Sequence, residues 1–173
     1  MNGQISKKQT DLKFPDPPRG LKAIPWRLPS LLYHLGLGGL LGKRFLLLNH
    51  VGRKTGQHRQ AVLEIIQSYP DDTRYLVASG FGRSSHWYRN IRQSPNVSIQ
   101  VSRKKINVIA QELTPQSAGQ VMVEYAEKNP GAIKTLAHLI GYDIEHSPAG
   151  YRIFGESIPV IQFTSDPGRI MPE

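Results

Sequence analysis

Strand-like segments joined by very short connections constrain the fold of this chain most strongly. Residues 96–102 and 105–113 alternate apolar and polar side chains with a period of two, and only the tight connection around "SRKK" separates them. Three further apolar segments of strand length precede this pair: residues 44–49, 60–68 and 74–79. Neighbouring parallel strands need a crossover of about a dozen residues or more. The pattern therefore predicts an antiparallel sheet or barrel and disfavours a doubly wound parallel sheet.

Helices are predicted between and after these strands. Ser84 or Ser85 is a suitable N-cap for a helix over 84–95, which Pro95 would end. Thr114 as N-cap followed by Pro115 predicts the start of another helix. The remaining expected elements are a short helix starting near Leu31, helices over 114–130 and 131–142, a loop, and a last strand over 157–165.

The domain organisation is predicted to be simple, since 173 residues suit one domain. Residues 1–25 are polar and broken by prolines, and we expect a flexible arm followed by a single domain over 26–173. No signal peptide is expected, so the predicted location is the cytoplasm. The apolar stretch 28–42 is interrupted by glycines and His34, which disfavours a membrane span but is compatible with contact at a membrane surface.

Positive charge is concentrated in the middle of the chain. The net charge is +9, and the segment from Pro17 to Gln111 holds fifteen of the 22 Lys and Arg residues but three of the 13 acids. Such a field attracts anions, among them nucleic acids, lipid headgroups and phosphorylated cofactors.

The connection between the first two predicted strands carries part of this charge. Its sequence is "NHVGRKTGQHRQ", residues 49–60, with Arg53, Lys54 and Arg59 close to two glycines. A plain hairpin needs only turn-forming residues, whereas this turn adds cationic side chains to a backbone that can approach a ligand closely. We interpret it as an anion-binding turn.

Several other site types are excluded or disfavoured. The chain has no cysteine, which excludes disulfides and thiolate nucleophiles. The segment "GLGGLLGKR" has neither P-loop nor dinucleotide-binding spacing, and no G-x-S-x-G elbow is present. The six histidines form no close ligand pair with carboxylates, so no metal site is expected. Nucleic-acid binding is disfavoured because most of the candidate stacking aromatics (Tyr75, Phe81, Trp87 and Tyr88) fall in a loop or a helix rather than on an alternating strand.

The combined motifs resemble the deazaflavin-dependent nitroreductase family. The matching elements, in order, are "GRKTGQ-R" (52–59), "VASG" (77–80), "WYRN" (87–90), "SPNV" (94–97) and "IPV" (158–160), and the resemblance extends from about residue 30 to 164. It implies an α+β fold, a split antiparallel β-barrel of about six strands with flanking helices, of the FMN-binding split-barrel type. It also implies the deazaflavin F420 as cofactor, hydride transfer to an electron-poor acceptor such as a quinone, nitro compound or activated alkene, and a homodimer.

The resemblance assigns roles to particular residues. Arg53, Lys54 and Arg59 would bind the anionic phosphodiester and polyglutamate tail of F420, while Thr55 and Gly56 would supply a hydroxyl donor and a closely approaching backbone. The other residues expected to contact the cofactor are Ser79, Gly80, His86 and Trp87. Tyr142 and Tyr151 are candidate proton donors. FMN is the first alternative cofactor, and a non-catalytic protein that binds an anionic cofactor is the alternative function.

Overall fold

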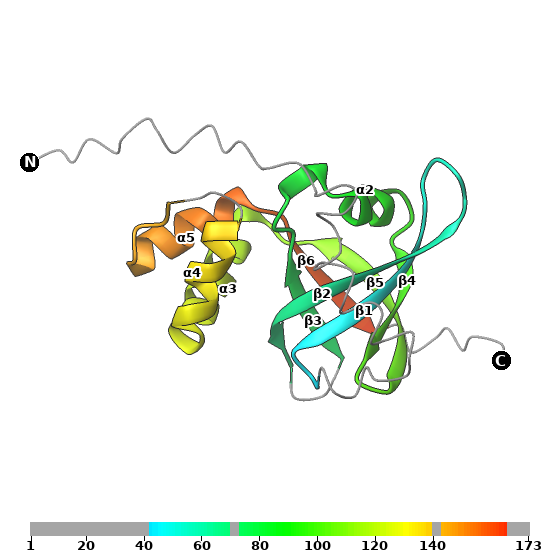
Figure 1. Cartoon of the computed structure of the whole chain (residues 1–173), viewed down its shortest axis with the longest axis horizontal. Helices are drawn as coiled ribbons and strands as arrows, with labels where there is room; N and C mark the ends of the chain where they lie inside the picture. The colour runs from blue at the N-terminus through cyan, green and yellow to red at the C-terminus, as the bar shows by residue number, and fades with distance from the viewer. Residues whose placement is uncertain (1–41, 70–72, 140–142, 166–173) are drawn as a thin grey trace, which may run out of the picture.

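The strands form a closed antiparallel barrel. A computed structural model describes residues 42–69, 73–139 and 143–165. Within these residues six strands pair in the order β1–β2–β3–β6–β5–β4 around the barrel. The strands are β1 (Phe45–Val51), β2 (His58–Ser68), β3 (Arg74–Ala78), β4 (Asn96–Val101), β5 (Lys104–Glu112) and β6 (Val160–Ser165). The predicted six-stranded antiparallel barrel with flanking helices is therefore confirmed (Figure 1).

Chain-neighbouring strands pair as the short connections require. The pairs β1–β2, β2–β3 and β4–β5 are all antiparallel, and β1 closes the barrel against β4 with Leu46 opposite Val101. The tight β4–β5 turn is completed by Ser102, whose φ of 53° lies in the left-handed region. Leu46 and Leu48, two positions apart on β1, both pack in the barrel core, because alternate side chains of a strand point to the same face.

A short helical segment covers the end of the barrel near the β1–β2 connection. It consists of the 3₁₀ turn η4 (Gly82–Ser84) and helix α2 (His86–Gln93). Tyr88 and Ile91 of α2 are buried in the barrel core. The Tyr88 hydroxyl donates to the Glu112 carboxylate of β5 at 2.7 Å and accepts from the Arg83 guanidinium at 3.0 Å. Burial raises the pKa of Tyr88 and the nearby Glu112 carboxylate raises it further, so this group stays a neutral donor that ties α2 to the barrel wall.

Three helices form a lobe on the other side of the barrel (Figure 1). They are α3 (Pro115–Lys128), α4 (Pro130–Leu139) and α5 (Pro148–Ser157). The backbones of α3 and α5 touch at Gly119 and Gly155. A Cβ on Gly155 would lie 2.6 Å from the Ala118 carbonyl oxygen and 2.8 Å from the Gly119 Cα. Glycine is required at this crossing because no side chain fits between the two helices.

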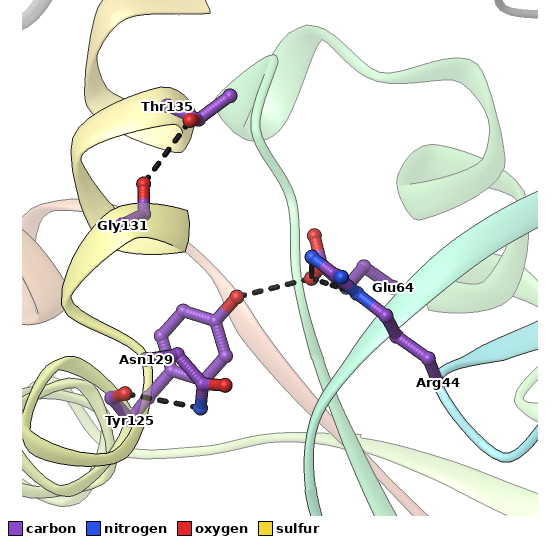
Figure 2. Close-up of polar contacts among 6 residues, drawn as sticks. All are labelled: Arg44, Glu64, Tyr125, Asn129, Gly131 and Thr135. Atoms are coloured by element: carbon purple, nitrogen blue, oxygen red, sulfur yellow. Dashed lines mark hydrogen bonds and ion pairs between the residues drawn. The ribbon is translucent and has the colours of Figure 1, made fainter.

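A polar contact and apolar packing connect this lobe to the barrel. Figure 2 shows the Tyr125 side chain of α3 pointing to Glu64 of β2, where the Arg44 guanidinium also ends. The Tyr125 hydroxyl donates to Glu64 Oε1 at 3.1 Å, and Arg44 Nη2 donates to the same oxygen at 3.0 Å. Burial and the Glu64 carboxylate both raise the pKa of Tyr125, which keeps the phenol protonated. Beneath this contact, Ile66 of β2 packs in one apolar cluster with the lobe helices.

The region expected to be a loop before the last strand contains a helix, α5. Ser147 is its N-cap, accepting a hydrogen bond from the Gly150 N–H at 3.1 Å, and Pro148 occupies its first turn. This start signal is the same as Thr114–Pro115, which predicts the start of α3. The last strand consequently begins at Val160 instead of residue 157.

Other expectations differ in detail or lie outside the described residues. Ser85 holds the N-cap position of α2, but its side chain makes no capping bond. The short helix near Leu31, the arm over 1–25 and all but the last residue of the apolar stretch 28–42 fall outside the described residues. Among the described helices, none is long and apolar enough to cross a membrane.

Candidate functional site

The β1–β2 turn is closed by its own backbone. The Gly52 N–H donates to the Gln57 carbonyl at 2.8 Å, while the Thr55 and Gly56 N–H groups donate to the Gly52 carbonyl at 3.2 and 2.8 Å. Gly56 has a φ of +67°, a conformation that glycine adopts without strain. The turn therefore has a defined shape, and it projects from the barrel beside α2 (Figure 1).

Three cationic side chains extend from this turn. Arg53 is half-buried, whereas Lys54 and Arg59 are exposed. Arg59 Nη2 donates to Gln57 Oε1, a neutral acceptor, at 3.0 Å. Within the described parts of the chain, the ion pairs join Arg44 to Glu64 and Arg83 to Glu112, away from the turn. The positive charge of the turn is thus not cancelled by any of the described carboxylates.

Asn90 of α2 holds the beginning of the turn. Its Oδ1 accepts from the Arg53 backbone N–H at 3.2 Å and from Arg53 Nη1 at 3.1 Å. Its Nδ2 lies 3.1 Å from Nδ1 of His50, the sixth residue of β1. Asn90 and His50 are 5 % and 6 % exposed, so this chain of contacts is largely shielded from water. One amide of α2 thus holds both the end of β1 and the turn that follows it.

The surroundings of His50 favour the uncharged form of its ring. Burial lowers its pKa from the ordinary value of 6.5, a hydrogen bond with the Val51 backbone opposes this, and the positive charge of Arg59 lowers the pKa again. Arg59 lies directly opposite His50 in the β1–β2 register. The neutral ring leaves one nitrogen as an acceptor, which the Asn90 amide requires.

The segment Ser79–Trp87 forms the second part of the candidate site. Ser79 is fully buried; its N–H donates to the Pro159 carbonyl at 2.9 Å and its hydroxyl contacts Ser85 Oγ at 2.8 Å. The Ser79 amide is therefore already used, and the role predicted for it as a direct ligand is not supported by this geometry. Gly80 and Trp87 are half-buried and His86 is exposed, so these three residues are accessible to a ligand.

The N-terminus of α2 carries backbone donors beside this segment. The first intrahelical bond runs from the Arg89 N–H to the Ser85 carbonyl at 3.1 Å. Because Ser85 bonds to Ser79 instead of capping the helix, its hydroxyl does not take up the N–H groups of the first turn. Free N–H groups at a helix N-terminus favour an anion.

Of the two predicted tyrosines, the one that the structure describes, Tyr151, does not lie beside the turn. Tyr142 falls outside the described residues. Tyr151 lies on α5, in the lobe on the far side of the barrel from the turn (Figure 1). Its ring is half-buried and lies 6.4 Å from the His146 ring. Two of the aromatics considered for base stacking, Tyr75 and Tyr88, are 3 % and 1 % exposed, which leaves them unable to stack on nucleobases.

Asn90 and His50 were missed as parts of the site. Asn90 stands within the "WYRN" motif, and a signal for it exists: it is a polar residue adjacent to Ile91 on the buried side of a short helix. Buried polar side chains are almost always hydrogen-bonded, so such a position predicts a specific partner. The identity of that partner required the three-dimensional structure.

Comparison with protein families gives one match that covers more than half of the chain. The sequence model for F420H(2)-dependent quinone reductase matches residues 35–135. This span includes the turn, η4 and α2, and it ends within α4.

Individual proteins agree with this match. F420H(2)-dependent quinone reductases of two Mycobacterium tuberculosis strains, CDC 1551 and H37Rv, are each 34 % identical over 98 residues, covering 51 % of this chain. The match spans 63 % of the length of these relatives.

Solved structures include an F420-H2 dependent reductase (FDR-A) with 20 % identity and a TM-score of 0.47, covering 70 % of this chain and 95 % of that chain. They also include the heme storage protein HutZ from Vibrio cholerae, with 16 % identity and a TM-score of 0.48, covering 82 % of this chain and 92 % of that chain.

Proposed function

The chain belongs to the F420H(2)-dependent quinone reductase family, and from this membership we propose that it is an oxidoreductase that transfers hydride between F420 and an electron-poor acceptor. Quinones are the first acceptor class to test, and nitro compounds and activated alkenes are the next.

The observation that carries this proposal is the closed cationic turn. F420 has an anionic phosphodiester and a polyglutamate tail. Arg53 can offer a planar fork of N–H donors to phosphate oxygens, while Lys54 acts as a compact point charge. Thr55 adds a hydroxyl and Gly56 a backbone without a side chain. The donor set of this turn therefore fits the chemistry of the cofactor's charged end.

The protein's contribution is binding, orientation and exclusion of water. When bound, reduced F420 supplies the hydride. Gly80, His86 and Trp87 are proposed to contact the cofactor, and Ser79 is proposed to support them by fixing the end of β3 against Pro159 and Ser85. Tyr142 and Tyr151 remain the proposed proton donors; because Tyr151 lies on α5, away from the turn that would bind the charged tail, it would act at the ring end of the cofactor. No protein nucleophile is required for this reaction.

Binding and turnover are measured separately to test the proposal. Titration with F420, followed by fluorescence, should show saturable binding that falls at least about tenfold in Arg53→Ala/Lys54→Ala, because a hydrogen bond to a charged group contributes ~1.5–3 kcal/mol. Reduction of menadione should consume F420H2. F420 binding without consumption of F420H2 would identify a non-catalytic binding protein. Saturable binding of FMN and not of F420 would show that FMN is the cofactor.

Tyr151→Phe in the same assay should lower turnover and leave F420 affinity unchanged.

The finer expectations on assembly and location are part of this proposal. We expect a homodimer, which light scattering of the purified protein measures directly. We also expect a cytoplasmic protein that contacts membranes through residues 28–42. Cosedimentation with lipid vesicles, compared between the full chain and a variant with two leucines of that stretch changed to serine, tests this contact.

A further inference from the structure

Asn90 makes contacts that its place on a core-facing helix does not by itself require. A side chain that only filled space at the end of the barrel would be apolar, like its neighbour Ile91. Instead, both ends of the Asn90 amide are engaged: Oδ1 accepts two hydrogen bonds from Arg53, and Nδ2 meets His50. Buried amides are costly unless fully satisfied, so these contacts specify one arrangement of the turn.

The orientation of the amide follows from its partners. Both Arg53 groups are N–H donors, so the Asn90 atom that faces them must be the oxygen. The nitrogen then faces His50, and His50 Nδ1 must carry a lone pair. This places the ring proton on Nε2 of a neutral imidazole. Asn90 can hold Arg53 in this way only while His50 provides an acceptor.

Arg53 keeps its positive charge in this arrangement. Asn90 is a neutral acceptor and uses one guanidinium nitrogen, Nη1, leaving other N–H groups of the side chain for a ligand. An aspartate at the same position would accept the same bonds but would neutralise Arg53. The chain thus uses an uncharged residue where a carboxylate would bind Arg53 more strongly.

We propose that Asn90 is a positioning residue that holds Arg53 in place for an anionic cofactor without neutralising it, and that His50 acts through Asn90 by fixing the orientation of its amide. This inference rests on the proposed function, since the anion is the charged end of F420. It adds two residues that act through Arg53 and do not themselves touch the ligand.

A double-mutant cycle distinguishes positioning from a general structural role. Asn90→Ala should weaken F420 binding about five- to tenfold, consistent with a hydrogen bond to a charged group. In the Arg53→Ala background the same substitution should change the affinity less than twofold, because the bond from Arg53 Nη1 is already gone and only the bond from the backbone N–H remains. Losses that multiply in the double variant would overturn the proposal. The matched control is Gln162→Ala, which removes a 3.2 Å side-chain hydrogen bond to Thr164 on β6, away from the turn, and should change the affinity less than twofold.

Two conservative variants test the chemistry of the contact. Asn90→Asp should retain Arg53 in position and still weaken F420 binding about tenfold, because the added carboxylate cancels the charge; unchanged affinity would refute the requirement for a neutral acceptor. His50→Asn offers an oxygen near the position of Nδ1 and should bind F420 within about twofold of wild type, whereas His50→Ala should resemble Asn90→Ala.

A measurement without cofactor separates this inference from the proposed function. The Arg53 backbone N–H donates to Asn90, so its hydrogen exchange in the ligand-free protein should be at least about tenfold faster in Asn90→Ala. Unchanged exchange would overturn the positioning role even if F420 binds. If the wild-type protein shows no F420 affinity, the proposed function fails and the anion-presenting role fails with it, whatever the exchange rate.

Discussion

At the scale of single residues, the buried His50 stabilises the folded protein most when its ring is uncharged. Burial lowers the pKa of His50 below 6.5. Between that lowered value and 6.5 the unfolded chain binds more protons than the folded one, so the free energy of unfolding falls as the pH drops through this window. Above pH 6.5 the ring is neutral in both states and the contribution is complete.

Removing the titrating ring should remove this pH dependence. His50→Asn is expected to lose less stability than wild type between pH 7 and pH 5, because its side chain carries no proton to gain. Urea unfolding followed by circular dichroism at several pH values measures the difference. The control is His58→Asn, since His58 is exposed at the start of β2. Parallel pH profiles for His50→Asn and wild type would contradict the expectation.

At the scale of elements, the contact between α3 and α5 sets the geometry of the helical lobe. Gly155→Ala should destabilise the protein by about 1–3 kcal/mol, because the new Cβ would overlap Ala118 and Met122 in a packed interface. Gly131→Ala is the matched control: its Cβ would meet no atom within 4 Å, and alanine favours the helix by up to ~1 kcal/mol. The urea midpoint of unfolding should therefore fall for Gly155→Ala and stay the same or rise for Gly131→Ala. Equal shifts in the two variants would show that the α3–α5 crossing does not require glycine.

The same lobe shows why some elements were predicted and one was not. Strand pairs such as β4–β5 could be identified because period-two alternation and a short connection are local signals. The start signal of α5, Ser147 followed by Pro148, is equally local, but it lies after a segment that carries glycine and acidic residues, which are typical of a loop. Its apolar face became evident only through packing against α3.

At the scale of the whole molecule, the placement of charge matters more than its total. The net charge is +9, and two of the lysines lie near opposite ends of β1. Lys54 lies on the turn that follows β1. Lys104 begins β5 and pairs with Val101 of β4, which in turn pairs with Leu46 near the start of β1. A seven-residue strand separates these ends by roughly 20 Å, about two and a half times the ~8 Å screening length at physiological salt.

Two substitutions that remove the same charge should therefore have different effects. Lys54→Gln is expected to weaken F420 binding about threefold or more, and Lys104→Gln less than twofold, when affinity is measured near 0.15 M salt. Equal losses would mean that F420 responds to the overall field and not to the turn.

The sequence indicates the cationic part of the candidate site but not its buried contacts. Arg53, Lys54 and Arg59 could be identified because a basic, glycine-containing turn between two strands is visible in one short stretch. The buried pair of Asn90 and His50 could not, since it joins residues 40 positions apart. Nor could the sequence reveal that the Ser79 N–H is already donated to Pro159.

The glycine contact between α3 and α5 also provides a way to sort relatives. Any homologue that retains this helix crossing must keep very small residues at the positions of Gly119 and Gly155, whatever it binds at the turn. This pair is therefore a signature of the C-terminal architecture that can be read independently of the cofactor motif, and chains that carry one without the other would mark where the two halves of the protein have diverged separately.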